Sequence, residues 1–143
     1  MTSSSIETVG NSVVSQTSAG RNTLKILVSA TLATSAVHFI DNAFRLDLYP
    51  GPAWLTRSGI LLAWLVLPVL ALAAYWSANR AALIAYGLLG FAGFAHYLPI
   101  HRHPVPLRCF ATIFAEALAS AALIVFVVFR GTALSQPAVQ KPK

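Results

Sequence analysis

Four long stretches of the chain consist almost entirely of apolar residues, and each is bounded by charged or turn-forming residues. They cover residues 24–44, 54–78, 81–100 and 107–130. A helix needs roughly 20 mostly apolar residues to cross the hydrocarbon core of a bilayer, and every stretch reaches that length. None alternates polar and apolar residues as a membrane β-strand would. The sequence therefore predicts an all-α integral membrane protein, an up-and-down bundle of four transmembrane helices.

The composition excludes an ordinary soluble domain. Of the 143 residues, 57% are hydrophobic and only 10% are charged, whereas about a quarter of a soluble globular domain is charged. The single cysteine, Cys109, excludes an internal disulfide and a paired-cysteine metal motif. The net charge of +6 is explained by the positions of basic residues around membrane spans, so we expect no nucleic-acid partner.

The connections between the four stretches are short, which forces consecutive helices to run antiparallel. The first contains two prolines and a glycine over residues 49–52, the second is Asn79-Arg80, and the third, residues 99–106, holds three prolines. Prolines of this kind make stiff turns rather than flexible linkers. Residues 1–22 and 131–143 have no helical period, so we expect a disordered N-terminal segment, a transmembrane domain over residues 23–130 and a disordered C-terminal tail.

Basic residues next to the spans predict the orientation, because Lys and Arg are enriched in cytoplasmic loops. One side of the predicted bundle carries six of them: Arg21, Lys25, Arg80, Arg130, Lys141 and Lys143. The other side carries four: Arg45, Arg57, Arg102 and Arg108. This bias predicts a multi-pass protein of the inner (plasma) membrane with both termini in the cytoplasm. The alternative is a secretory signal cleaved after Ala36, which would leave three helices.

Three ionisable side chains are expected at one depth in the bilayer. At a rise of about 1.5 Å per residue, His38 and His96 lie about 20 to 22 Å from the inner ends of their helices, and Glu116 lies about 10 Å from the outer end of its helix. In a core roughly 30 Å thick, all three fall about 8 to 11 Å below the outer surface. A charged group there must be neutralised, paired or hydrated, so these residues predict a buried polar layer.

The candidate site consists of this layer and its surroundings. Its four central residues are His38, Asp41, His96 and Glu116, and the residues expected around them are Asn42, Arg45, Tyr97 and Arg108. On the first helix, Thr31, Thr34, His38, Asp41 and Arg45 recur every three or four residues. Such a polar stripe belongs inside a bundle rather than against lipid.

Three functions are compatible with this layer. The leading hypothesis is a structural or complex-associated membrane subunit, whose partners are the lipid bilayer and other membrane subunits or a second copy of the chain. The second is a cofactor site, with His38, His96 and Glu116 as metal ligands or the two histidines as axial ligands of a b-type haem. The third is an enzyme or binding protein for a lipid-like substrate, in which the His, Asp and Glu side chains handle protons.

Overall fold

The computed structural model describes residues 3–48, 54–97 and 106–134, with side chains placed for residues 18–48, 54–95 and 106–130. All regular structure within these residues is helical. The elements are α1 (Ser3–Phe44), α2 (Arg57–Trp76), α3 (Arg80–Leu89), the 3-10 helix η1 (Ala92–Tyr97) and α4 (Leu107–Leu134). The predicted connections at residues 49–52 and 99–105 lie outside the described part of the chain.

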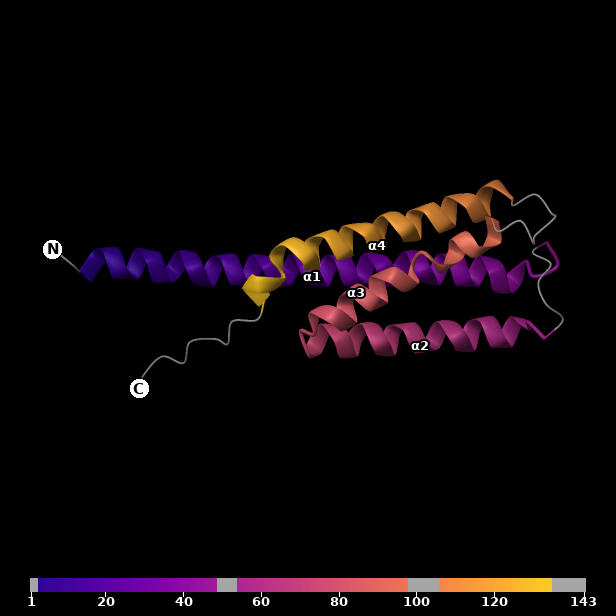
Figure 1. The fold of residues 1–143 in the computed structure, drawn as a ribbon, viewed down its shortest axis with the longest axis horizontal. Helices are drawn as coiled ribbons and strands as arrows, with labels where there is room; N and C mark the ends of the chain where they lie inside the picture. The colour runs from indigo at the N-terminus through magenta and orange to yellow at the C-terminus, as the bar shows by residue number, and fades with distance from the viewer. Residues whose placement is uncertain (1–2, 49–53, 98–105, 135–143) are drawn as a thin grey trace.

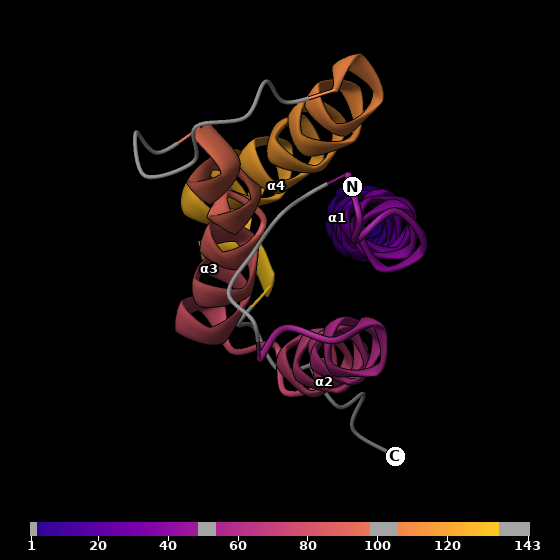
Figure 2. The same ribbon diagram turned by 90° about the vertical axis from the view of Figure 1, so that its right-hand side faces the viewer.

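The four α-helices form an antiparallel bundle. Consecutive helices run in opposite directions (Figure 1), and the view along the bundle places them at four corners (Figure 2). Contacts join α1 to α2, α2 to α3, α3 to α4 and α4 back to α1, and the contact between α1 and α4 is the most extensive. The all-helical prediction is therefore confirmed for the described residues, and the first and last helices of the bundle share its most extensive contact.

Three of the helices are long and apolar enough to cross a membrane. The corresponding segments are Ser18–Phe44, Arg57–Trp76 and Leu107–Arg130, with 27, 20 and 24 residues. At about 1.5 Å per residue, the shortest of them is about 30 Å long, which matches the hydrocarbon core of a bilayer. The helix of α2 continues through Pro68.

The third stretch differs from the prediction of one helix over residues 81–100. The α-helix ends at Leu89, Gly90 caps it, and the chain continues as η1. Glycine weakens a helix interior because it has no side chain and loses much conformational freedom on folding, and Gly87, Gly90 and Gly93 follow one another here at three-residue intervals. The two helices together rise about 27 Å, since a 3-10 helix rises about 2.0 Å per residue.

The beginning of α1 and the end of α4 also differ from the prediction. Helix α1 begins at Ser3, so a helix occupies most of the segment 1–22 for which no regular structure was expected, and it projects beyond the other helices (Figure 1). Once a helix has formed, each further residue extends it at little cost, which allows a long α1 despite its polar first half. Helix α4 continues to Leu134, and residues 135–143 lie outside the described part.

Polar side chains fix where the helices begin. Thr56 accepts a hydrogen bond from the backbone N–H of Gly59 at the start of α2, and Asn79 accepts one from Ala82 at the start of α3. Both are N-caps, which satisfy backbone donors left over in the first turn. The turn between α2 and α3 is so tight that Ala78 adopts a φ of 49°, a left-handed conformation that favours glycine.

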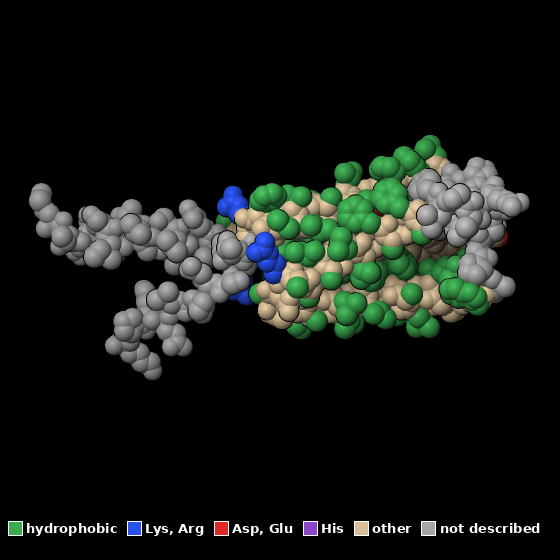
Figure 3. Space-filling view, viewed as in Figure 1, with side chains coloured by type: hydrophobic (Ala, Val, Ile, Leu, Met, Phe, Trp, Pro, Cys, Tyr) green, Lys and Arg blue, Asp and Glu red, His purple; other side chains and the backbone are tan. Residues whose placement is uncertain are grey.

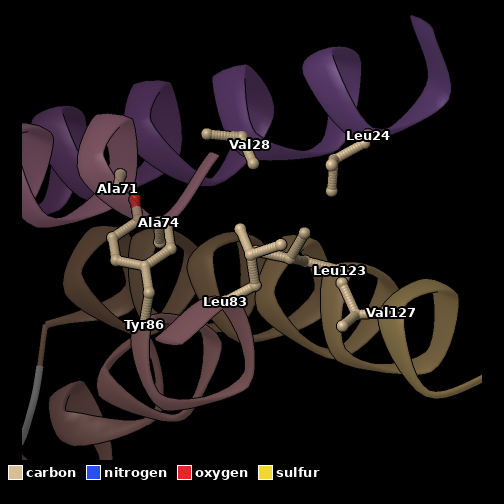
Figure 4. Packing of buried hydrophobic residues seen from close by; sticks show 8 residues of the cluster. All are labelled: Leu24, Val28, Ala71, Ala74, Leu83, Tyr86, Leu123 and Val127. Atoms are coloured by element: carbon tan, nitrogen blue, oxygen red, sulfur yellow. The ribbon is translucent and has the colours of Figure 1, made fainter. Parts of the chain in front are cut away.

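We call the half of the bundle nearer the turn between α2 and α3 its inner half, and the opposite end its outer end. The core of the inner half is apolar and receives side chains from all four helices (Figure 4). Its buried residues are Leu24, Val28, Ala71, Ala74, Leu83, Tyr86, Leu123 and Val127. A smaller cluster at the outer end contains Cys109 and Ile113, with Phe94 packed against it. Large apolar side chains also cover the outside of the bundle (Figure 3), which is the surface expected of a protein surrounded by lipid.

Charged side chains lie near the two ends of the bundle. Lys and Arg side chains gather at the end from which α1 projects (Figure 3). The exposed basic residues of the helix ends there are Arg21, Lys25, Arg80 and Arg130. The guanidinium of Arg80 donates a 2.7 Å hydrogen bond to the Val128 carbonyl and so ties α3 to α4. The opposite end carries Asp41 and Asp47 together with Arg45, Arg57 and Arg108.

Candidate functional site

The centre of the site is a contact between His38 of α1 and Glu116 of α4. The imidazole Nδ1 lies 2.5 Å from the carboxyl Oε2, and each side chain is 4% exposed. Polar side chains continue on the same faces, with Thr31 and Ser35 buried on α1 and Ser120 buried on α4. The two helices that share the most extensive contact of the bundle therefore carry these five buried polar side chains.

One proton lies between these two side chains whenever the pair is neutral overall. The proton resides either on Nδ1, giving imidazolium and carboxylate, or on Oε2, giving imidazole and carboxylic acid. Both forms have zero net charge, which is the condition under which ionisable groups are tolerated inside an apolar medium.

The imidazole of His38 packs directly against the backbone of η1. A Cβ placed on Gly93 would lie 2.6 Å from Cε1 and 3.3 Å from Nδ1 of the ring, and 3.1 Å from Ile113. Such separations are shorter than van der Waals contact, so only glycine leaves room for the ring in this position. The break in the third stretch thus places a bare backbone against His38.

The two preceding glycines of the third stretch, Gly87 and Gly90, bring α3 close to α4. A Cβ on Gly90 would overlap the Ser120 side chain, and one on Gly87 would lie 2.7 Å from Ile124. Small residues of this kind allow helix backbones to approach closely in membrane proteins. Ser120 therefore packs against Gly90 of the third stretch. Along α4, it lies one helical turn from Glu116.

Asp41 forms an ion pair on its own helix. Its Oδ1 lies 2.9 Å from Nε of Arg45, at the i, i+4 spacing that brings side chains together. The Asp41 side chain is partly exposed and Arg45 more so. This pair stands at the outer end of α1, on the exposed side of the His38–Glu116 contact.

The other residues expected around the site have different surroundings. The thiol of Cys109 lies 3.9 Å from Oδ1 of Asn42, a contact that joins the outer ends of α1 and α4. Arg108 is exposed. The backbones of His96 and Tyr97 belong to η1, but their side chains lie outside the described part of the structure, so no position is assigned to the imidazole of His96.

The cofactor hypotheses remain predictions. Within the residues whose side chains are described, no group of three or more His, Cys, Asp and Glu side chains is close enough to hold a metal ion. Of the three expected metal ligands, His38 and Glu116 are in contact. The third ligand of that set, and the second axial ligand of a haem, would be His96.

Sequence reasoning missed several polar groups in the interior. Ser35 lies one turn from His38 on α1, and the hydroxyl of Tyr86 is enclosed between α3 and the other helices. The three-residue spacing of Ser35 from His38 is the one signal that could have placed Ser35 on the same face of the helix. Tyr86 carries no such signal, because a tyrosine within an apolar stretch is more often part of the core.

Fold and site together define a small four-helix bundle with membrane-length apolar helices and a buried His–Glu pair between its first and last helices. Comparisons of the chain with protein-family models, curated proteins and solved structures found no match. The function is therefore argued from the geometry alone.

Proposed function

We propose that this chain is a multi-pass protein of the inner membrane that crosses the bilayer four times, with the third crossing made by α3 and η1. Support comes from the three helices of membrane-spanning length and from the apolar exterior of the bundle. The exposed basic residues at the end where α1 projects, with no acidic residue among the described side chains there, favour placing both termini in the cytoplasm.

We infer that its role is structural, as a membrane subunit whose partners are the lipid bilayer and other membrane proteins. The observation that carries this inference is the enclosure of the His38–Glu116 pair. The pair is almost completely buried, its two residues are 78 positions apart in sequence and belong to different helices, and η1 packs against it through Gly93. A pair held in this way fastens α1 to α4, in the manner of interhelical hydrogen bonds in membrane bundles.

The experiment that tests this role compares two substitutions at Glu116 in detergent-solubilised protein. Glu116→Gln keeps a hydrogen-bonding group of the same length opposite Nδ1, whereas Glu116→Ala leaves the imidazole without it. A fastening role predicts that the alanine variant unfolds at a clearly lower temperature and that glutamine restores part of the loss. Equal thermal stability of wild type and both variants would contradict the role.

Elemental analysis of untagged protein separates fastening from a metal or haem site. The structural role predicts iron, zinc and copper at background levels in the wild type and in His38→Ala. Stoichiometric metal in the wild type that is lost in His38→Ala would replace this proposal with the cofactor hypothesis. A visible absorption band in the same sample would identify the haem form of it.

A further inference from the structure

Four polar groups buried inside the bundle have no hydrogen-bond partner among the described residues. They are the hydroxyls of Ser35, Tyr86 and Ser120 and the indole Nε1 of Trp64. The three hydroxyl-bearing residues are at most 4% exposed. Buried polar groups are normally paired, because leaving one unpaired in an apolar surrounding costs its whole interaction with water. Four such groups in one small bundle therefore require an explanation.

Three of these groups lie at the same level, one helical turn inward from the His38–Glu116 contact. Because α1 and α4 are antiparallel, three residues back from His38 leads to Ser35, and four residues forward from Glu116 leads to Ser120. The Ser120 side chain points toward α3, where a Cβ on Gly90 would overlap it. The two serines thus lie on facing helices at matching heights.

The register between α1 and α2 brings Trp64 to this level as well. Nε of Arg57 donates a 2.9 Å hydrogen bond to the Ala43 carbonyl. Seven residues further along α2 is Trp64, and eight residues back along α1 is Ser35. The same register holds seven residues further along each helix, because Val28 of α1 and Ala71 of α2 belong to one buried cluster. The indole N–H therefore comes from a third helix at the height of the two serines.

The fourth group, the Tyr86 hydroxyl, is supplied by α3. Tyr86 lies one turn before Gly90, and its ring extends beside Ala71 and Ala74 (Figure 4). Apolar side chains lie on both sides of this layer of unpaired polar groups. Leu24, Leu83, Leu123 and Val127 close the inner end, and Cys109, Ile113 and Phe94 close the outer end.

We propose that ordered water occupies this layer and bridges Ser35, Trp64 and Ser120. The groups present fit water and not an ion, because the indole N–H only donates, the hydroxyls both donate and accept, and none is charged. A buried water makes two to four hydrogen bonds to such groups. It lies one turn from Glu116, where it also lowers the cost of enclosing the His38–Glu116 pair by adding polar surroundings to it.

The direct test is water-to-protein magnetisation transfer in the nuclear magnetic resonance spectrum of the full chain in detergent. The probe is water itself, observed from the Trp64 indole proton, which is assigned by its disappearance in Trp64→Phe. The expected result is a cross-peak between this proton and a long-lived bound water. No water cross-peak, or a cross-peak only to protons of a co-purified apolar alcohol, would overturn the proposal.

A second measurement uses the stability of serine variants. If water bridges the serines, Ser35→Ala and Ser120→Ala each lower the unfolding temperature, and the double variant loses little more than the larger single loss, because the first substitution already breaks the bridge. If the layer is dry, removing an unpaired hydroxyl raises the unfolding temperature in each variant and the gains add. The matched control is Ser29→Ala, an exposed position on the same helix, where no change is expected.

Discussion

Gly93 is the residue whose missing side chain most directly shapes the site. The ring of His38 occupies the space that a Cβ would take, so the identity of one residue on η1 determines where the imidazole lies. A side chain there would push the ring away from Glu116 or push η1 away from α1. Either movement weakens the contact that joins the first and last helices.

We therefore expect Gly93→Ala to destabilise the bundle by about 1 to 3 kcal/mol, the usual cost of overpacking a well-filled interior. Thermal unfolding in detergent measures the loss. Gly59→Ala is the control, because a Cβ there meets only the end of the Thr56 side chain, at 3.1 Å. Its unfolding temperature should stay at or above that of the wild type, since alanine favours a helix more than glycine does. An unfolding temperature for Gly93→Ala equal to that of the control would contradict the described packing.

The turn between α2 and α3 should become more stable when Ala78 is replaced by glycine. Its φ of 49° is a left-handed conformation that costs an alanine roughly 1 to 2 kcal/mol more than a glycine. Ala78→Gly should therefore raise the unfolding temperature, although glycine usually destabilises. Ala85→Gly, at an exposed position inside α3, should lower stability by about 1 kcal/mol. Two changes of the same sign would contradict this account of the turn.

The start of α3 depends on the N-cap at Asn79. Its side chain accepts a 3.0 Å hydrogen bond from the backbone N–H of Ala82, and removing such a cap costs about 1 kcal/mol. Asn79→Ala should lower the unfolding temperature, while Asn79→Ser, which keeps an accepting oxygen, should lower it less. Identical unfolding temperatures for the two variants would show that α3 does not depend on this bond.

The elements could be predicted from the sequence where apolar length alone decides the outcome, as it does for α2 and α4. The third stretch could not be predicted, because three-residue glycine spacing is compatible both with a continuous, closely packed helix and with the observed break after Leu89.

The depth of His38 and Glu116 follows from counting residues along a helix. Their mutual contact does not, since it depends on how α1 and α4 are rotated about their axes. Ser35, Trp64 and Tyr86 carry no sequence signal for a shared polar layer.

The orientation of the whole molecule gives a prediction that does not involve the site. A fluorescent protein that folds only in the cytoplasm should be active when fused after residue 143 and inactive when inserted at residue 51, since these positions lie on opposite sides of the membrane in the proposed topology. Alkaline phosphatase, which is active only outside the cytoplasm, should give the reverse pattern. Phosphatase activity at the C-terminal fusion would contradict the proposed orientation.

In the proposed structural role, the His38–Glu116 pair holds the bundle together, and the chain contains a natural probe for this property. Cys109 is the single cysteine and is completely buried near the outer end of the α1–α4 interface. A thiol-reactive dye therefore reacts with it only when the bundle opens. No cysteine has to be introduced to follow unfolding in this way.

The most direct test is the temperature at which Cys109 becomes reactive in wild type, Glu116→Gln and Glu116→Ala. Leaving a buried hydrogen-bonding group unpaired costs about 1 to 3 kcal/mol, so the alanine variant should expose the thiol several degrees below wild type, with the glutamine variant in between. The same temperature for all three proteins would mean that the buried pair does not hold α1 to α4, and the central claim would be wrong.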